Sequence, residues 1–234
     1  MKSISKFALA ASLGLAIALT FSCSSDDGDG GGVSSSSGGG EQGGGSSSSG
    51  GNQGGGSSSS VGGGITYGEP VNHGGEDYPT VTIGSQTWFA KNLNYEVGES
   101  VCYDNDLNNC GIYGRLYDWN TAKTACPNGW HLPSNAEWSA LITAVGGSRG
   151  YAKLKAENGW NGNDNATNDY GFSALPGGRF FEESFRDVGD CGYWWSDSED
   201  GSNRATVRLM CDGDIAGTSS PNKSNLISVR CVKD

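Results

Sequence analysis

The sequence predicts an α+β domain with two short helices and a loop-rich antiparallel sheet, preceded by a long segment without regular structure. Three observations lead to this class. Two stretches in the middle of the chain have apolar residues at helical spacing, with a clear stop or start signal. The segments that follow alternate apolar and polar residues, as half-buried strands do. Before residue 65, the chain is almost entirely Gly and Ser once an initial apolar run has ended.

Residues 1–22 are predicted to be a lipoprotein signal peptide. Two lysines precede an uncharged run from Phe7 to Phe21. That run is shorter than the about 20 apolar residues that span a membrane. It is followed by a small residue and then Cys23, an arrangement that resembles the bacterial lipobox. We therefore expect Cys23 to be lipidated and to become the mature N-terminus. Cleavage as an ordinary secretory signal is the alternative.

Residues 23–64 are predicted to be a disordered tether. They are so rich in Gly and Ser that they cannot bury enough apolar area to offset the entropy of ordering. Asp26, Asp27 and Asp29, just after the cysteine, resemble the acidic signal that sends some lipoproteins of Bacteroidetes-like bacteria to the outer surface. We therefore expect a lipid-anchored protein of the outer membrane that faces the cell exterior.

The composition limits the partners of the folded part. All seven tryptophans and all nine tyrosines lie after residue 64, which places the core there. The net charge is −11, and nucleic acid, whose phosphates require a basic face, is therefore not expected as a partner. Contact with a membrane is expected only through the lipid. We divide the remaining chain into a lead-in segment, 65–80, and a folded domain, 81–234.

The first expected elements of the domain are a hairpin and a helix. Residues 81–83 and 86–93 are predicted to be its strands, joined at Gly84-Ser85. Residues 118–126 have apolar residues at helical spacing, and Pro127 follows directly. Proline cannot continue a helix, so the first helix is expected to end there.

A second helix and a strand-rich region are expected to follow. Ser134 and Glu137 have the spacing of a capping box, and the helix that they begin is expected to end at Gly146. Residues 157–171 are rich in Asn, Asp and Gly and are predicted to be a long surface loop. Four segments are predicted strands: 172–175, 193–196, 205–210 and 226–232.

Long motifs in this region resemble a known family. They are YGRLYDW at 113–119, CPNGWHLPSNAEW at 126–138, GFSALPGGR at 171–179, YWWS at 193–196 and SVRCVKD at 228–234. Together they resemble the Fibrobacter succinogenes major paralogous domain, over 81–234. Their layout is also similar to that of C-type-lectin-like and sulfatase-modifying-factor domains. The resemblance implies two helices that flank a twisted antiparallel sheet, with a long loop region.

The cysteines are expected to form three disulfides. The chain has seven, and setting Cys23 aside for lipidation leaves an even number, as is usual in an oxidising compartment. Spacing favours only one local pair, and the resemblance implies the other two. The expected bridges are Cys102–Cys110, Cys126–Cys231 and Cys191–Cys211.

No catalytic activity is expected. Sulfatase-modifying relatives use reactive cysteines, but every cysteine here has an expected partner. Neither His73 nor His131 lies near a Ser/Asp pattern typical of a catalytic triad. An enzyme like the sulfatase-modifying factors is therefore the least favoured hypothesis.

A binding role is favoured. In lectin-like folds the ligand surface is the long loop region, and flat aromatic rings beside polar groups suit sugars. We expect binding to plant polysaccharide, with recognition of a cell-surface protein as the alternative. Trp160 and Phe180 or Phe181 are expected to be exposed on one face. The candidate ligand-binding residues are Trp160, Asn161, Asn163, Asp164, Tyr170, Phe180, Phe181, Arg186 and Tyr193.

No cofactor is expected to be required. The loop from Asn161 to Asp169 has oxygen donors that could hold a structural calcium ion, which takes six to eight oxygen ligands. The Glu-Pro-Asn, Gln-Pro-Asp and Trp-Asn-Asp signatures of calcium-binding lectins are, however, absent from the matched region. The metal is therefore left unassigned.

Overall fold

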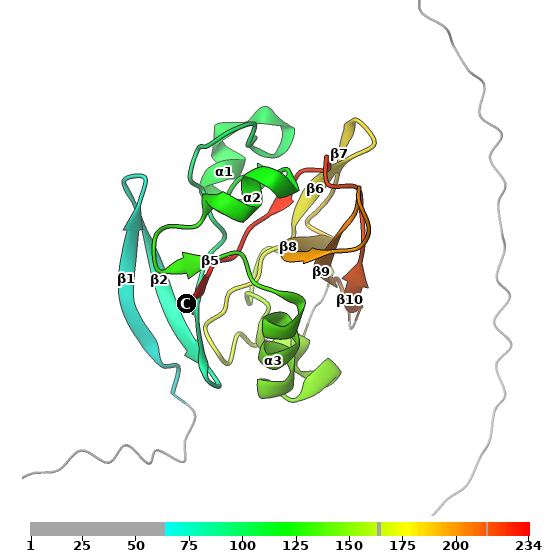
Figure 1. Cartoon of the computed structure of the whole chain (residues 1–234). Helices are drawn as coiled ribbons and strands as arrows, with labels where there is room; N and C mark the ends of the chain where they lie inside the picture. The colour runs from blue at the N-terminus through cyan, green and yellow to red at the C-terminus, as the bar shows by residue number, and fades with distance from the viewer. Residues whose placement is uncertain (1–63, 163–164, 214) are drawn as a thin grey trace, which may run out of the picture. The chain divides into compact units, whose positions relative to one another are not determined.

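The computed structural model describes residues 64–162, 165–213 and 215–234 (Figure 1). The expected signal peptide, Cys23 and nearly all of the expected tether lie outside the described residues. Within the part that the structure describes, no helix is long and apolar enough to cross a membrane.

One sheet contains the two ends of the domain, in the order β1-β2-β3-β12-β5. The expected hairpin is present, but β3 ends four residues earlier than Leu93, and β2 begins before residue 81. The lead-in segment 65–80 is therefore largely β-strand and pairs with the domain. The strands are β1 (Tyr67–His73), β2 (Glu76–Ile83), β3 (Gln86–Phe89), β5 (Trp130–His131) and β12 (Val232–Lys233).

The second sheet has the order β10-β9-β8-β11-β4, and β6 pairs with both β7 and β8. Its strands are β4 (Leu116–Tyr117), β6 (Gly177–Phe181), β7 (Ser184–Val188), β8 (Cys191–Glu199), β9 (Ala205–Cys211), β10 (Ala216–Ser219) and β11 (Ile227–Ser228). The strands predicted at 193–196 and 205–210 are confirmed as parts of β8 and β9. Segment 172–175 is not a strand, because Ala174 makes only an isolated bridge to Lys155.

The single strand expected over 226–232 is also wrong. The segment contributes β11 to the second sheet and β12 to the first, so it crosses from one sheet to the other. The β6–β7 hairpin was not expected at all. The change of sheet involves pairings between distant parts of the chain, which local alternation does not reveal.

Both predicted helices are confirmed. The side chain of Asp118 accepts hydrogen bonds from the backbone of Asn120 and Thr121 and caps α2, and Ser134 and Glu137 form both halves of the capping box of α3. One further α-helix and two 3-10 helices were not predicted. The helices are η1 (Tyr103–Asn105), α1 (Leu107–Tyr113), α2 (Trp119–Ala125), α3 (Asn135–Ala144) and η2 (Gly147–Lys153).

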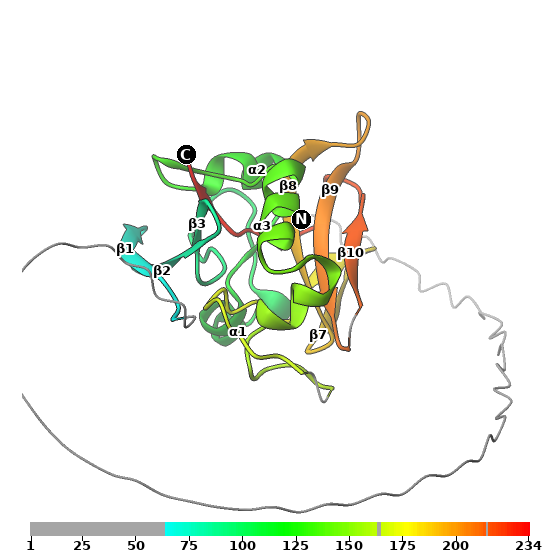
Figure 2. The ribbon, with the colours of Figure 1, turned by 90° about the horizontal axis from the view of Figure 1, so that it is seen from below.

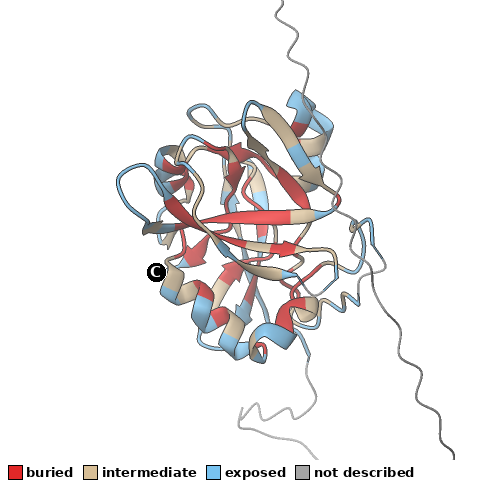
Figure 3. Cartoon of the chain, turned by 90° about the vertical axis from the view of Figure 1, so that its right-hand side faces the viewer, coloured by how far each residue is buried: buried red, intermediate tan, exposed pale blue. Residues whose placement is uncertain are grey.

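The core lies on both faces of β8. Tyr193 and Trp195 belong to one buried cluster with residues of α2, and Trp194 belongs to a second one with Trp138 of α3. This division follows from the period of two along a strand. Figure 2 shows α3 beside β8, and Figure 3 shows the buried residues concentrated in the central strands.

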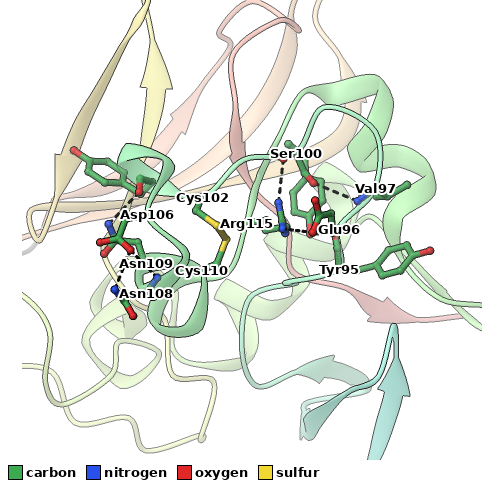
Figure 4. Close-up of a disulfide and its surroundings, with 12 residues drawn as sticks. Tyr95, Glu96, Val97, Ser100, Cys102, Asp106, Asn108, Asn109, Cys110 and Arg115 are labelled. Carbon is green, nitrogen blue, oxygen red and sulfur yellow. Dashed lines mark hydrogen bonds and ion pairs between the residues drawn. A yellow bond between two sulfur atoms is a disulfide. The ribbon is translucent and has the colours of Figure 1, made fainter.

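Three disulfides fasten the domain, in the pairing that the resemblance implied: Cys102–Cys110, Cys126–Cys231 and Cys191–Cys211. The Cys126–Cys231 bridge closes the longest stretch of chain, from the end of α2 to the residue before β12. Cys191 and Cys211 are directly opposite each other on β8 and β9. The local bridge connects the start of η1 to α1, beside Arg115, which donates to the Ser100 carbonyl and pairs with Glu96 (Figure 4).

The buried guanidinium of Arg230 connects the two sheets with the segment that follows the long loop. Arg230 is fully buried, and its guanidinium donates to the carbonyls of Phe89 and Phe172 and to the amide oxygen of Asn92. It also lies 4.4 Å from the centre of the Phe172 ring. Burial lowers the pKa of Arg230 to about 9. Carbonyl oxygens, rather than an acid, surround this charge.

Candidate functional site

The β6–β7 hairpin projects from the second sheet and carries several of the predicted ligand-binding residues (Figure 1). Phe180 pairs with Phe185, and Phe181 with Ser184, so only Glu182 and Glu183 form the turn. Both glutamates have positive φ, 48° and 60°. Such two-residue turns favour Asn-Gly, so the turn itself gave no signal of a hairpin in the sequence.

An ion pair fixes the base of the hairpin. The Nε of Arg179 lies 3.0 Å from Oδ2 of Asp187, and the Tyr193 hydroxyl donates to the same oxygen over 2.9 Å. The Arg179 guanidinium lies 4.3 Å from the centre of the Tyr193 ring. Burial, with the hydrogen bond to Asp187, raises the pKa of Tyr193 to about 12. Tyr193 is thus a buried support of the hairpin and not the exposed ligand contact that the sequence suggested.

A cleft of ≈ 660 Å³ lies between the hairpin and the segment that leads from β10 to β11. We call it the hairpin cleft. It is lined on the hairpin side by Arg179, Phe180, Phe181, Glu182 and Glu183, and on the other side by Arg204, Ser219, Ser220, Pro221, Asn222, Ser224 and Asn225. Phe180 and Phe181, both half-buried, therefore belong to the same wall of this cleft.

Backbone pairing holds the two walls of the hairpin cleft in place. The amide of Phe180 donates to the Leu226 carbonyl over 2.9 Å, which fixes β6 beside the start of β11. The far wall is attached to the start of β9, because Arg204 and Asn222 form an isolated bridge. Leu226 also lines a second hollow of ≈ 470 Å³, which shares Asn222 and Ser224 with the cleft. The two hollows therefore adjoin along one polar segment.

The far wall offers hydrogen-bonding groups and little apolar surface. Asn225 is only 8% exposed, and its Nδ2 has no hydrogen-bond partner among the described residues. The Asn222 amide oxygen accepts from the backbone and the hydroxyl of Ser224, both at 3.1 Å. These residues and Arg204 were not predicted. The polar sequence Ser-Ser-Pro-Asn-Lys-Ser-Asn indicates only a loop, and its proximity to the hairpin depends on the sheet topology.

Arg186 is paired with Arg179 across the hairpin but is not among the residues that line the cleft. It is exposed, its Nε donates to the Ser184 hydroxyl over 2.9 Å, and its Nη2 lies 3.3 Å from Glu182. Its guanidinium also lies 5.6 Å from the centre of the Phe181 ring. Arg186 therefore supports Glu182 and the Phe181 ring, which line the cleft, but does not line the cleft itself.

Trp160 and Asn161 lie at the other end of the hairpin. The amide of Asn161 donates to the Gly189 carbonyl over 2.8 Å, beyond the Val188–Gly177 pair that closes the base. Trp160 is half-buried against the second core cluster, with the Lys155 ammonium 4.5 Å from its ring. The expectation that Trp160 and Phe180 or Phe181 are exposed on one face is therefore wrong, because all three residues are half-buried. Packing against the core explains the difference.

The other candidates do not join the cleft. Tyr170 is half-buried and lines a separate hollow of ≈ 160 Å³ beside Ile65 and Ile83. Asn163 and Asp164 lie outside the described residues. The side chain of Asp212 accepts from the Gly162 amide over 2.8 Å beside this loop. Across the residues that the structure describes, no group of His, Cys, Asp or Glu is arranged to hold a metal, and structural calcium stays a prediction.

His131 connects α3 to the C-terminal residue. Its Nε2 lies 2.8 Å from Glu137, and its Nδ1 lies 2.6 Å from Asp234. Burial lowers the pKa of His131, but the hydrogen bonds that the ring donates to the carboxylates of Asp234 and Glu137 outweigh it and raise the pKa above its ordinary value. Because carboxylates occupy both ring nitrogens, this imidazole is placed as a structural ion pair and not as a base beside a nucleophile.

Comparison with known proteins supplies the family and nothing further. Neither the curated proteins nor the solved structures contain a match to this chain. The family model described as Fibrobacter succinogenes major domain matches residues 81–233. The match includes α1, α2, α3, all three disulfides and both walls of the hairpin cleft. Since it covers more than half of the chain, the protein belongs to the Fibrobacter succinogenes major domain family.

Proposed function

We propose that this chain is a lipid-anchored outer-membrane protein that faces the cell exterior and binds plant polysaccharide in the hairpin cleft. The observation that carries the proposal is the chemistry of the two walls: phenyl rings on one side, hydroxyl and amide groups on the other. Sugar rings have apolar faces that stack on aromatic rings and polar edges that form hydrogen bonds. A polymer can also continue into the adjoining hollow across Asn222 and Ser224.

Attachment through Cys23 and the Gly- and Ser-rich segment that follows it would suit this function. A Gly- and Ser-rich coil would hold the domain away from the membrane and let it reorient towards an insoluble surface. The acidic residues after the cysteine support the external face. The negative net charge of −11 also favours a neutral polymer over nucleic acid.

We further propose that the domain has a C-type-lectin-like fold. Three features support this assignment. The order of α2 and α3 matches it, as does the disulfide from Cys126 after α2 to Cys231 before the last strand. The long loop region lies between α3 and β8, as expected of such a domain. The hairpin cleft, formed by the end of that region, is then in the part of the fold that lectins use.

Recognition of another cell-surface protein is the alternative. Arg179 and Arg186 lie 4.7 and 5.6 Å from the Phe181 ring, and arginine with aromatic residues is typical of binding hot spots between proteins. An enzyme like the sulfatase-modifying factors is less favoured, because a reactive cysteine must be a free thiolate. The six cysteines of the described part are all disulfide-bonded.

The proposal is tested with the full chain, produced under oxidising conditions and mixed with insoluble cellulose or xylan, with and without a calcium chelator. Phe181→Ala is compared with Ile112→Ala, which removes an apolar side chain that is 57% exposed on α1. We expect wild type and Ile112→Ala to be retained and Phe181→Ala to bind about tenfold more weakly. Loss of binding in the presence of the chelator would show that the site requires calcium. Failure of correctly oxidised wild type to bind either polymer contradicts the proposal and favours a protein partner.

A further inference from the structure

The turn of the β6–β7 hairpin is made of residues that its backbone does not favour. Glu182 and Glu183 have φ of 48° and 60°, in the left-handed region that is disfavoured for residues other than Gly, Asn and Asp. An Asn-Gly pair would form the same two-residue turn with less strain. The turn therefore lowers the stability of the domain relative to a more suitable sequence.

Contacts of Glu182 and Glu183 within the domain add little stability to offset this strain. Glu182 makes one exposed ion pair with Arg186, at 3.3 Å, and exposed pairs of this kind add little stability. Glu183 makes no hydrogen bond or ion pair within the described residues. Both glutamates nevertheless line the hairpin cleft beside Phe181.

A second, independent feature of the cleft is the unsatisfied amide of Asn225. The residue lines the far wall, is more than nine-tenths buried, and its Nδ2 has no partner among the described residues. A buried donor without a partner is costly. One wall thus has carboxylate acceptors, and the other includes a residue whose amide nitrogen is buried and lacks an acceptor. A hydroxyl group satisfies both, because it donates and accepts.

We infer that Glu183 and Asn225 contact the ligand from opposite walls, and that the ligand is a neutral, hydroxyl-rich glycan and not a polyanionic one. This inference rests on the proposed function and adds the ligand class to it. A uronate chain would bring its carboxylates towards Glu182 and Glu183. Of the cleft's charged groups, Arg179 is paired with Asp187 and Glu182 with Arg186. This leaves the Glu183 carboxylate, which has no ion pair in the described part, to repel a uronate, and Arg204 on the other wall.

The test uses the full chain with its disulfides formed, and compares soluble xylan and glucomannan with polygalacturonate. Glu183→Gln removes the charge of one acceptor. The double variant E182N/E183G removes both carboxylates and installs the favoured turn. Glu69→Gln, an exposed residue of β1 whose side chain makes no hydrogen bond or ion pair in the described part, is the matched control. Affinity and thermal unfolding are measured for each.

We expect wild type and Glu69→Gln to bind the neutral glycans and not polygalacturonate, with Glu183→Gln several-fold weaker and E182N/E183G at least about tenfold weaker. The double variant is also expected to unfold about 2–4 °C higher, because strain is removed. A purely structural turn could not give weaker binding together with higher stability. Full affinity in E182N/E183G, or preference for polygalacturonate, overturns the inference while glycan binding stands. Absence of glycan binding by wild type overturns the proposed function and the inference with it.

Discussion

Arg230 and Asn92 are joined inside the domain by two hydrogen bonds to one amide oxygen, from Nε at 3.1 Å and Nη2 at 2.8 Å. The indole of Trp194 donates to the same oxygen over 2.8 Å. The Asn92 amide oxygen thus connects three segments: the chain after β3, strand β8 through Trp194, and the segment between β11 and β12 through Arg230. It explains why an arginine can occupy a fully buried position: the planar guanidinium directs several donors at carbonyl oxygens in fixed directions.

Arg230→Lys should therefore be strongly destabilising although it keeps the charge. An ammonium cannot reproduce the planar set of donors, so buried carbonyls lose their partners at about 1–3 kcal/mol each. We expect the free energy of unfolding to fall by at least about 2 kcal/mol in denaturant titrations. Arg149→Lys, at an exposed position, serves as the control and should change it by less than about 0.5 kcal/mol. Equal stability of the two variants would contradict this role of Arg230.

The ion pairs of His131 should make stability depend on pH. The folded-state pKa of His131 is raised from 6.5, so its contribution is complete below that value and is lost as pH rises through the folded-state pKa. The pKa of Glu137 is lowered from 4.5, because hydrogen bonds from Ser134 and His131 outweigh burial. Its contribution is therefore lost as pH falls through that lowered value.

His131→Gln should thus lower the melting temperature most at about pH 5.5 and progressively less towards about pH 8.5. Melting curves across this range measure the difference from wild type. Asp234→Asn removes one of the two acids and should reduce the pH dependence without abolishing it. A difference that grows towards high pH would have the wrong sign for this account.

The disulfides should differ in their contribution to stability. The Cys126–Cys231 bridge spans a separation of 105 residues, and the Cys102–Cys110 bridge one of 8. In the chain-entropy model, removing the long one should cost about 4–5 kcal/mol and removing the local one about 2.5 kcal/mol. Double cysteine-to-alanine variants, unfolded in denaturant, provide the comparison. A larger loss from the local pair would show that strain or local structure, and not loop closure, decides the order.

Gly178 should be required for the hairpin. Its φ is 64° and a Cβ there would meet the Arg186 carbonyl oxygen at 2.4 Å. Gly201 has a φ of 82° but open space around it. Gly178→Ala should therefore cost more than Gly201→Ala, by about 1–3 kcal/mol, and should weaken binding in the cleft because it shifts β6 against β7. Similar costs for both variants in denaturant titrations would show that only φ matters.

Local signals made the helices predictable. The apolar spacing of α2 with Pro127 after it, and the Ser134–Glu137 pair of α3, act within a few residues, so α2 and α3 can be recognised without the rest of the fold. The hairpin β6–β7 was missed because Glu182-Glu183 is an unfavoured turn. The strand expected over 226–232 was wrong because a change of sheet does not alter the alternation of side chains.

The candidate site was only half predictable. Phe180 and Phe181 could be selected by residue type, but burial decides which aromatic residues remain available. Tyr193 donates a hydrogen bond to Asp187, and Trp160 packs on the core, although both are residue types that commonly contact ligands. Asn225 could not be found, because its position opposite the hairpin depends on a pairing between β6 and the start of β11.

The most direct test of the central claim compares Phe181→Ala with Asn161→Ala in binding to soluble xylan or glucomannan. Phe181 lies in the hairpin cleft, and Asn161 is an exposed residue at the other end of the hairpin. The account predicts about tenfold weaker binding for Phe181→Ala and an unchanged affinity for Asn161→Ala. Weaker binding for Asn161→Ala, with Phe181→Ala like wild type, would place the ligand on the long loop and contradict the assignment of the cleft.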